Sequence, residues 1–191
     1  MRARLTPTRV FDVVGATAAL TLAAPVLVAA ALAIRLGDGA PVLFRQQRLG
    51  RGRRPFTIVK LRTMDAGRVT PLGAVLRDLG VDELPQLYNV LRGDMGLVGP
   101  RPVTAADVRR VGWDAPRFDA RWLVPPGLTG PAQIAAPRRC DVRLSWRLDA
   151  RYVRRRSLAL DLRVLAASLL VPLLGKRRAR LVLRHLQRKL P

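Results

Sequence analysis

The chain has 191 residues, of which 35 are lysine or arginine and 13 are aspartate or glutamate, so its formal net charge is +22. Because 49% of the residues are apolar, the composition excludes a disordered basic tail. One cysteine and one histidine exclude an intrachain disulfide, a cysteine-based zinc cluster and a zinc site built on several histidines. Chemistry in this chain must therefore use carboxylates, basic groups and backbone dipoles.

The first predicted element is an apolar helix over residues 13–34, a stretch of 22 residues without a charge. At about 1.5 Å per residue, this helix is long enough to cross a hydrocarbon core of about 30 Å. A spanning helix, a secretory signal and a re-entrant helix that turns back within the bilayer all fit this pattern. Pro25 kinks the middle of the segment, and arginines flank both ends, which places both ends in the cytoplasm. We favour the re-entrant helix, because it satisfies both flanks.

The next segment is predicted to form a β-hairpin, with strands at residues 41–44 and 56–61 and a turn at 50–55. A helical pattern follows over residues 72–92 and is interrupted by Gly80 and Pro85, which places Asp82 near the start of a helix. The sequence further predicts a turn at 93–96, a helix at 103–121, and rigid loops at 98–102 and 125–131.

The C-terminal third is predicted to be helical and amphipathic. Residues 164–175 are uncharged but too few to span a bilayer, and residues 176–191 contain seven basic and no acidic side chains. This pattern indicates a helix in the interface of an anionic membrane, with a solvated basic tail as the alternative. We therefore expect an N-terminal flank and membrane helix at 1–35, a compact domain at 36–175 and a basic tail at 176–191. The predicted fold class is mainly α with a short β-hairpin.

One acidic pair stands out as a candidate for chemistry. Asp82 and Glu83, the only adjacent acids in the chain, begin the sequence DELPQLYNVLRGDM, which leads into VGPRP at residues 98–102. Adjacent carboxylates can divide roles: one binds a hard cation or attacks phosphorus, and the other tunes its pKa or handles a proton. The simpler alternative is a helix N-cap in water. The common glycine-rich phosphate-binding motifs are absent from the sequence.

The block from DELPQL to VGPRP resembles the signature of the bacterial sugar transferase family, the monotopic phosphoglycosyl transferases. Further segments resemble that family in the same order along the chain. They are RVFD at 9–12, FRQQRLG at 44–50, KLRTM at 60–64, PGLTGPAQ at 126–133, and Asp149 with Tyr152 ahead of Ser157 and Asp161. The resemblance covers residues 9 to 170, nearly the whole chain.

The resemblance implies an enzyme that transfers a sugar 1-phosphate from a nucleotide-activated sugar, commonly UDP-linked, to undecaprenyl or another polyprenyl phosphate. It implies a Mg²⁺-dependent ping-pong reaction in which Asp82 attacks the phosphorus and forms an aspartyl phosphosugar. Glu83 is then expected to assist with the metal or the proton, so both carboxylates are expected metal contacts. Lys60, Arg62 and Arg101 are the expected phosphate contacts. Asp149 is expected to shape the substrate site or to pair with a neighbouring arginine.

The resemblance also implies a monotopic protein of the bacterial cytoplasmic membrane, with its active site on the cytoplasmic face and a product that initiates a cell-surface glycan. The expected partners are the nucleotide sugar, the polyprenyl phosphate and an anionic membrane surface. No nucleic acid is expected, and a homodimer is allowed. The N-terminal helix of the family is a hairpin broken at a proline, which agrees with the argument from charge.

Some positions depart from the family pattern. Pro125 and Pro131 stand where the family usually has Arg and Trp, and Ala135, Ala136 and Pro137 replace an Asn-Gly-Arg segment. These departures motivate an alternative, a catalytically inactive relative that acts as a membrane scaffold. The net charge alone suggests a nucleic-acid binder, but 5% aromatic residues offer few stacking platforms.

Overall fold

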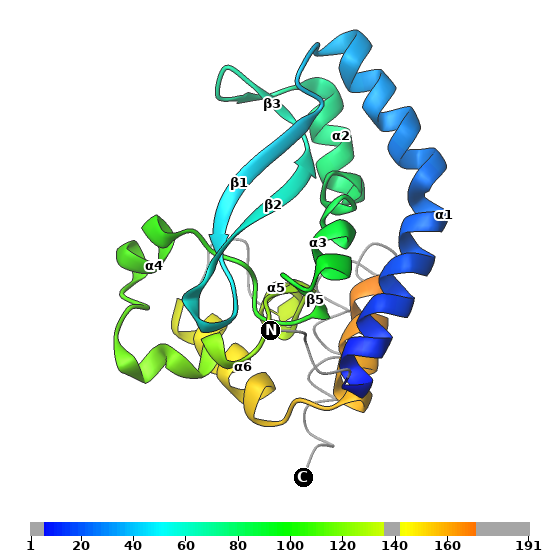
Figure 1. Ribbon diagram of the computed structural model, residues 1–191. Helices are drawn as coiled ribbons and strands as arrows, with labels where there is room; N and C mark the ends of the chain where they lie inside the picture. Colours follow the sequence, from blue (N-terminus) through cyan, green and yellow to red (C-terminus); the bar gives the residue numbers. More distant parts are fainter. Residues whose placement is uncertain (1–5, 136–141, 171–191) are drawn as a thin grey trace.

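The computed structural model describes residues 6–135 and 142–170 of the chain. Within them the fold is mainly helical with three two-stranded sheets, as the sequence predicted in outline (Figure 1). Several predicted features lie outside the described residues: residues 1–5 of the N-terminal flank, Ala136 and Pro137, the end of the predicted domain at 171–175, and the basic tail at 176–191.

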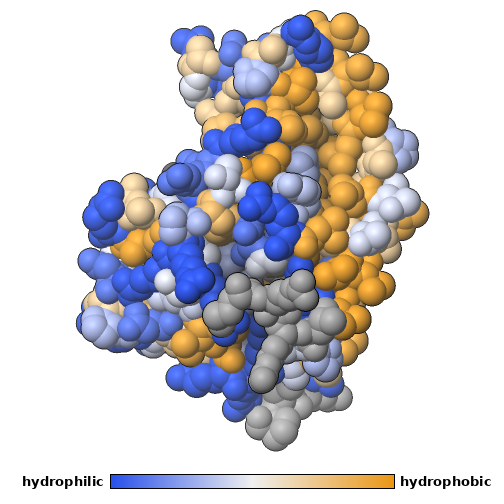
Figure 2. All heavy atoms as spheres, viewed as in Figure 1, coloured by the Kyte–Doolittle hydropathy of each residue, from blue (hydrophilic) through white to orange (hydrophobic). Residues whose placement is uncertain are grey.

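Helix α1 (Pro7–Gly37) is the longest element, with 31 residues, and its side-chain cap is Thr6. It continues as one helix through Pro25, and its axis bends part-way along (Figure 1). By length and composition it could cross a membrane, with a mean hydropathy of 2.2 in its most apolar window. Its apolar side chains form a continuous exposed surface along the helix (Figure 2), and Leu22 and Leu36 are 80% and 86% exposed. The re-entrant path through a bilayer stays a prediction.

The N-terminal turns of α1 are fastened to the domain by two charged side chains. The guanidinium of Arg9 donates to the carbonyl oxygens of Val90 (2.6 Å) and Leu91 (2.7 Å), at the end of helix α3 (Gln86–Arg92). Because the last carbonyls of a helix have no partner within it, Arg9 satisfies two of them. Asp12 is buried and accepts a hydrogen bond of 2.8 Å from the backbone N–H of Leu97 in strand β5 (Gly96–Val98).

The predicted β-hairpin is confirmed. Strands β1 (Leu43–Leu49) and β2 (Pro55–Leu61) pair antiparallel, with Phe44 opposite Lys60, and the short 3₁₀ turn Arg51–Arg53 joins them. The first strand begins two residues later and extends further than the sequence indicated. A second, two-residue pair follows at once, β3 (Met64–Asp65) with β4 (Arg68–Val69).

The interrupted helical pattern of residues 72–92 becomes two helices joined at the acidic pair. Helix α2 (Pro71–Leu79) ends at Gly80, whose positive φ of 72° is easily adopted by glycine alone. A single 3₁₀ turn (Val81–Glu83) follows, and α3 starts after Pro85. The acidic pair therefore lies on a sharp connection between two helices, near a helix start as expected.

The predicted turn at 93–96 and the predicted loops at 98–102 and 125–131 contain parts of a sheet that sequence reasoning missed. Strand β5 pairs in parallel with β6 (Gly127–Thr129). Glycines allow the chains to come this close, since a Cβ on Gly127 would lie 2.0 Å from the backbone nitrogen of Gly99. Three-residue strands between Gly and Pro residues carry no alternating pattern that a sequence could reveal.

The remaining elements are helical. Helix α4 (Ala105–Val111) ends at Gly112 and is followed by the 3₁₀ segment Pro116–Leu123, so the predicted helix over 103–121 is divided at that glycine. Short helix α5 (Pro131–Ala135), helix α6 (Val142–Arg154) and a helix over residues 158–170 complete the described fold. The largest core cluster joins α1, α3, β5 and the 158–170 helix.

The hydrogen bond from Leu97 to Asp12 generates a test of how α1 is attached. Asp12→Ala leaves a buried N–H without an acceptor, and we expect it to lower the free energy of unfolding by about 1–3 kcal/mol. Asp12→Asn keeps an acceptor oxygen and should lose less. Denaturant unfolding of the detergent-solubilised protein measures both variants. Equal losses in the two would contradict the role of this hydrogen bond.

Candidate active site

A cavity of about 830 Å³ lies between the β1–β2 hairpin, the α2–α3 connection and the 158–170 helix. Every one of these elements contributes side chains to its lining. The lining contains two chemically different sets of side chains; we call the charged set the basic wall and the hydrophobic set the apolar wall. The cavity holds the acidic pair that the sequence analysis singled out.

The basic wall carries five cationic and two anionic side chains. They are Arg48, Lys60, Arg62, Arg77 and Arg101, with Asp82 and Glu83. The cations outnumber the carboxylates, so the wall is formally positive and attracts anionic ligands. Guanidinium groups and a lysine in one cavity are the usual partners of phosphate oxygens.

Asp82 is largely buried, with 8% of its surface exposed, on the 3₁₀ turn between α2 and α3. Burial raises the pKa of its carboxyl group above the ordinary value, and the negative charge of Glu83 raises it further. The charges of Lys60 and Arg77 oppose this rise without cancelling it. Asp82 is thus a more basic carboxylate than one in water.

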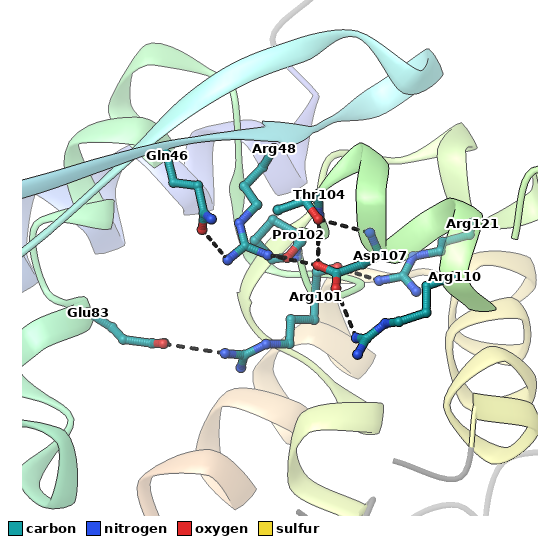
Figure 3. A network of polar contacts seen from close by, with 9 residues as sticks. All are labelled: Gln46, Arg48, Glu83, Arg101, Pro102, Thr104, Asp107, Arg110 and Arg121. Atoms are coloured by element: carbon teal, nitrogen blue, oxygen red, sulfur yellow. Dashed lines mark hydrogen bonds and ion pairs between the residues drawn. The ribbon is translucent and has the colours of Figure 1, made fainter. Parts of the chain in front are cut away.

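The pKa of Glu83 is shifted in the opposite direction. One of its oxygens, Oε1, lies 2.5 Å from the Nζ atom of Lys60 and 3.6 Å from the Nη2 atom of Arg101 (Figure 3 shows the contact with Arg101). Burial alone would raise the pKa of Glu83, but the charges of Lys60 and Arg101 outweigh it and lower the pKa. The pKa values of the two neighbouring carboxyl groups are therefore shifted in opposite directions.

Lys60 and Arg101, two of the predicted phosphate contacts, meet at Glu83, although 41 positions separate them in the chain. Arg62 also lines the cavity, but its guanidinium donates to the carbonyl oxygens of Asp38 (2.5 Å) and Gly39 (2.9 Å). These two hydrogen bonds hold the segment after α1. Phosphate contact by Arg62 stays a prediction.

Arg77 is a site residue that the sequence analysis missed. It lines the cavity, its Nε donates to the hydroxyl of Thr63 (2.8 Å), and its charge lowers the pKa of Asp82. The sequence did offer a signal for this role. Arg77 lies five residues before Asp82, in the last turn of a helix that ends at glycine.

Asp149 was predicted to shape the substrate site or to pair with an arginine. In the structure it pairs with an arginine. It is 1% exposed and lies 3.3 Å from a guanidinium nitrogen of Arg121. Burial raises the pKa of Asp149 to about 6, against the charge of Arg121. Asp149 is not among the residues that line the cavity. A direct contact between Asp149 and substrate stays a prediction, and the structure gives it an arginine partner.

The acidic pair offers few donors for a divalent cation. Among the described residues, no group of three or more His, Cys, Asp or Glu side chains could hold a metal ion. Asp82 and Glu83 supply hard carboxylate oxygens, which Mg²⁺ prefers, and Mg²⁺ is commonly bound by one or two carboxylates plus substrate phosphates. With Oε1 of Glu83 facing two cations, the remaining donors are the Asp82 carboxylate and the second Glu83 oxygen. This donor set fits Mg²⁺ bound jointly with a phosphorylated substrate.

The apolar wall completes the cavity with eight hydrophobic side chains. They are Phe44, Leu61, Met64, Leu84, Leu128, Ile134, Leu165 and Leu169. Three of these are well exposed: Phe44 at 44%, Met64 at 40% and Leu169 at 68%. A cavity lined by both cations and exposed apolar groups fits a ligand that joins an anionic head to a hydrocarbon chain.

The model of the bacterial sugar transferase family matches residues 3–175 of the chain. The chain belongs to the bacterial sugar transferase family. This identification confirms the resemblance drawn from the motifs around Asp82 and Glu83, and it covers all the residues that line the cavity.

Individual relatives carry related names. The chain is 49% identical to the "UDP-glucose:undecaprenyl-phosphate glucose-1-phosphate transferase" of Caulobacter vibrioides, over 66% of this chain and 52% of the relative. It is 36% identical to the "UDP-N-acetylgalactosamine-undecaprenyl-phosphate N-acetylgalactosaminephosphotransferase" of Aeromonas hydrophila, over 87% of this chain and 44% of the relative. The "Exopolysaccharide production protein PSS" of Rhizobium leguminosarum is 34% identical, over 82% of this chain and 90% of that protein. The chain thus spans about half the length of the first two relatives.

The ion pair of Lys60 with Glu83 can be tested without any substrate. Glu83 is the only glutamate in the chain, so glutamate labelled with ¹³C at its carboxyl carbon gives a single glutamate resonance for an NMR titration. Lys60→Met should raise the pKa of Glu83, because burial then acts with less opposing charge. Lys60→Arg keeps the cation and should preserve the lowered pKa.

The lowered pKa of Glu83 also makes the stability of the fold depend on pH. The folded-state pKa of Glu83 lies below its ordinary value of 4.5, so the ion pair stabilises the fold above pH 4.5. Its contribution is lost as the pH falls from 4.5 through the folded-state pKa, and Lys60→Met should remove this part of the dependence. An unchanged titration of Glu83 in Lys60→Met would contradict the assignment.

Proposed function

We propose that the chain transfers a sugar 1-phosphate from a UDP-activated sugar to undecaprenyl phosphate, giving a polyprenyl-diphospho-sugar that initiates a cell-surface glycan. Membership of the family and the printed names of the relatives support the reaction class. The observation that carries the proposal is the buried Asp82, with its raised pKa, beside a Glu83 that is paired with Lys60 and Arg101. Two relatives carry different sugars in their names, so the sugar is left open.

In the first half of the proposed reaction, the basic wall binds the diphosphate of the donor. Lys60, Arg77 and Arg101 offset the charge of its oxygens and of the transition state. A carboxylate oxygen of Asp82 attacks the phosphorus that carries the sugar, and the bond from this phosphorus to the UMP oxygen breaks. UMP leaves with the electron pair, and an aspartyl phosphosugar remains. The raised pKa of Asp82 favours this step, since a more basic carboxylate is a stronger nucleophile.

In the second half, an oxygen of the lipid phosphate attacks the same phosphorus and the acyl-phosphate bond to Asp82 breaks, which restores the carboxylate. Glu83 remains ionised beside its cations and keeps Lys60 and Arg101 next to the reacting phosphate. Asp82 and Glu83 would hold Mg²⁺ with the donor diphosphate. When bound, the ion would neutralise phosphoryl charge and assist the departure of UMP.

The apolar wall is the proposed place for the first isoprene units of the acceptor. Leu165 and Leu169 lie on the 158–170 helix at one side of the cavity, and Phe44 and Met64 lie on or just after the hairpin. A lipid phosphate bound here would put its head near Asp82 and its chain against exposed apolar groups.

We further propose that α1 is re-entrant and that the active site faces the cytoplasm. The exposed apolar length of α1, Pro25 within it and the arginines at both ends support this placement. A bent helix with both ends on one side holds the domain at the membrane surface, where polyprenyl phosphate resides.

The alternative of an inactive scaffold rests on departures from the family pattern. One of these, Pro131, is the first residue of α5, where proline is compatible with a helix start. The acidic pair with its cations is intact and lies in a cavity. These observations favour the enzyme over the scaffold.

The nucleophile can be tested by an isosteric change. Asp82→Asn should reduce UMP release from UDP-sugars with Mg²⁺ by roughly a thousandfold or more, because an amide oxygen cannot form the acyl phosphate. A panel of UDP-sugars in nanodiscs with undecaprenyl phosphate identifies the donor. Mass spectrometry of the quenched wild type should show an added phosphosugar on the Asp82 peptide.

Asp78→Asn is the matched control, because Asp78 is an exposed aspartate one helical turn earlier and does not line the cavity. It should release UMP at the wild-type rate. Normal turnover in Asp82→Asn would overturn the assignment of the nucleophile. Product without an adduct in the wild type would overturn the covalent mechanism.

The acceptor site can be tested separately, because the two half-reactions are separable. Leu169→Asn should raise the KM for undecaprenyl phosphate about three- to tenfold, the equivalent of about 1 kcal/mol of lost apolar contact. The burst of UMP release in the absence of acceptor should not change. Leu162→Asn is the control, since Leu162 lies on the same helix, is 47% exposed and does not line the cavity. Equal effects of the two variants would contradict the acceptor assignment.

A further inference from the structure

The backbone that carries Arg101 is held by hydrogen bonds at four consecutive residues. Each of the four carbonyl oxygens of residues 100–103 accepts a hydrogen bond from another part of the chain. Two donors are the backbone N–H groups of Gly127 and Leu49, each at 2.9 Å. The other two are the guanidinium groups of Arg121 and Arg48. Side chains and backbone groups from three separate segments thus fix the backbone of residues 100–103.

Arg121 is the buried member of this arrangement. It is 3% exposed, and its Nη2 donates to the carbonyl oxygen of Arg101. Its Nη1 lies 3.3 Å from a carboxylate oxygen of Asp149. Its guanidinium carbon lies over the rings of Trp113 (4.2 Å) and Trp122 (5.7 Å). Placing a guanidinium in such a site costs solvation energy, and in return the fork of donors has one fixed direction.

Arg48 holds the next residue from the opposite side. Its Nη1 donates to the carbonyl oxygen of Pro102 (3.4 Å) and lies 3.6 Å from Asp107, which with Thr104 forms the capping box of α4. Its Nη2 donates to Gln46 (2.5 Å) on the same strand. Figure 3 shows the two arginines reaching the 101–102 backbone from different elements.

The side chain of Arg101 is much freer than its backbone. It is 57% exposed, and its Nη2 reaches Glu83 at 3.6 Å. A long flexible side chain loses rotamer freedom when it pairs, and the geometry it reaches depends on where its Cα lies. Fixing the backbone at Arg101 therefore fixes the point from which its guanidinium reaches Glu83.

We propose that Arg121 is a positioning residue for the active site: by fixing the carbonyl of Arg101 from a buried pocket closed by Asp149 and Trp113, it sets the Arg101 guanidinium against Glu83. Arg48 supports the same segment through Pro102. Asp149 and Arg121 do not line the cavity, and this positioning role requires no contact with substrate. Its link to catalysis rests on the proposed function, whereas its effect on Glu83 does not.

The first test uses the single glutamate resonance of the chain and needs no turnover. Arg101→Ala should raise the pKa of Glu83, because the charge of Arg101 lowers it. Arg121→Lys cannot reproduce the guanidinium fork and should raise the pKa of Glu83 as well. The double variant should titrate like Arg101→Ala alone, since Arg121 acts on Glu83 through Arg101.

Arg53→Lys is the matched control. Arg53 lies 5.6 Å from the ring of Trp122 and pairs with Asp119 (2.6 Å) in the same 3₁₀ segment as Arg121, but it does not contact residues 100–103. It should leave the titration of Glu83 unchanged. If Arg121→Lys does not fold, Asp149→Asn keeps the guanidinium but removes its ionic partner, and it should shift the titration in the same direction as Arg121→Lys.

The second test measures UMP release in nanodiscs. Arg121→Lys should reduce kcat/KM about tenfold in the wild-type background and less than twofold in the Arg101→Ala background. Equal factors in both backgrounds, or an unshifted titration of Glu83 in Arg121→Lys, would overturn the positioning role. A wild type that releases no UMP while the Glu83 shifts appear as expected would overturn the proposed function and leave the positioning of Arg101 supported.

Discussion

The contact between Lys60 and Glu83 is the interaction on which the site depends. Two adjacent carboxylates in a partly buried place repel one another, and both would tend to bind protons. The ammonium at 2.5 Å keeps Glu83 ionised, with Arg101 as a second cation. Asp82 then receives the effects of burial and of its charged neighbour, and its pKa rises. One ion pair thus gives two identical functional groups different acidities.

The fold brings these groups together from distant parts of the chain. Lys60 comes from the β-hairpin, Glu83 from the turn between α2 and α3, and Arg101 from the segment after β5. Arg9 and Asp12 tie the apolar helix α1 to the end of α3 and to β5, close in the chain to the same segments. The element that could enter a membrane and the elements that carry the site are therefore parts of one packed unit. Such an arrangement suits chemistry between a soluble donor and a lipid acceptor.

Much of the fold could be predicted from the sequence, because the patterns that indicate these elements are local. The apolar block, the β-hairpin and the division of residues 72–92 at Gly80 and Pro85 follow from composition, alternation and the limits that these two residues place on the backbone. The β5–β6 pair was missed, because it is three residues long and depends on glycines at 99 and 127 that allow two distant backbones to touch. The helix predicted over 103–121 was too long, since Gly112 ends α4 in a left-handed conformation.

For the candidate site, the sequence by itself determined the acidic pair, the presence of only one histidine and one cysteine, and the family motifs that single out Lys60 and Arg101. Only the tertiary structure decided which cation meets which carboxylate: Lys60 at Glu83, Arg77 near Asp82, and Arg121 at Asp149, a pair that does not line the cavity. It also decided that Arg62 donates to the carbonyls of residues 38–39. The physical reason is that residue type fixes what a side chain can bind. Burial and distance, which decide its charge state and its partner, exist only once distant segments have packed together.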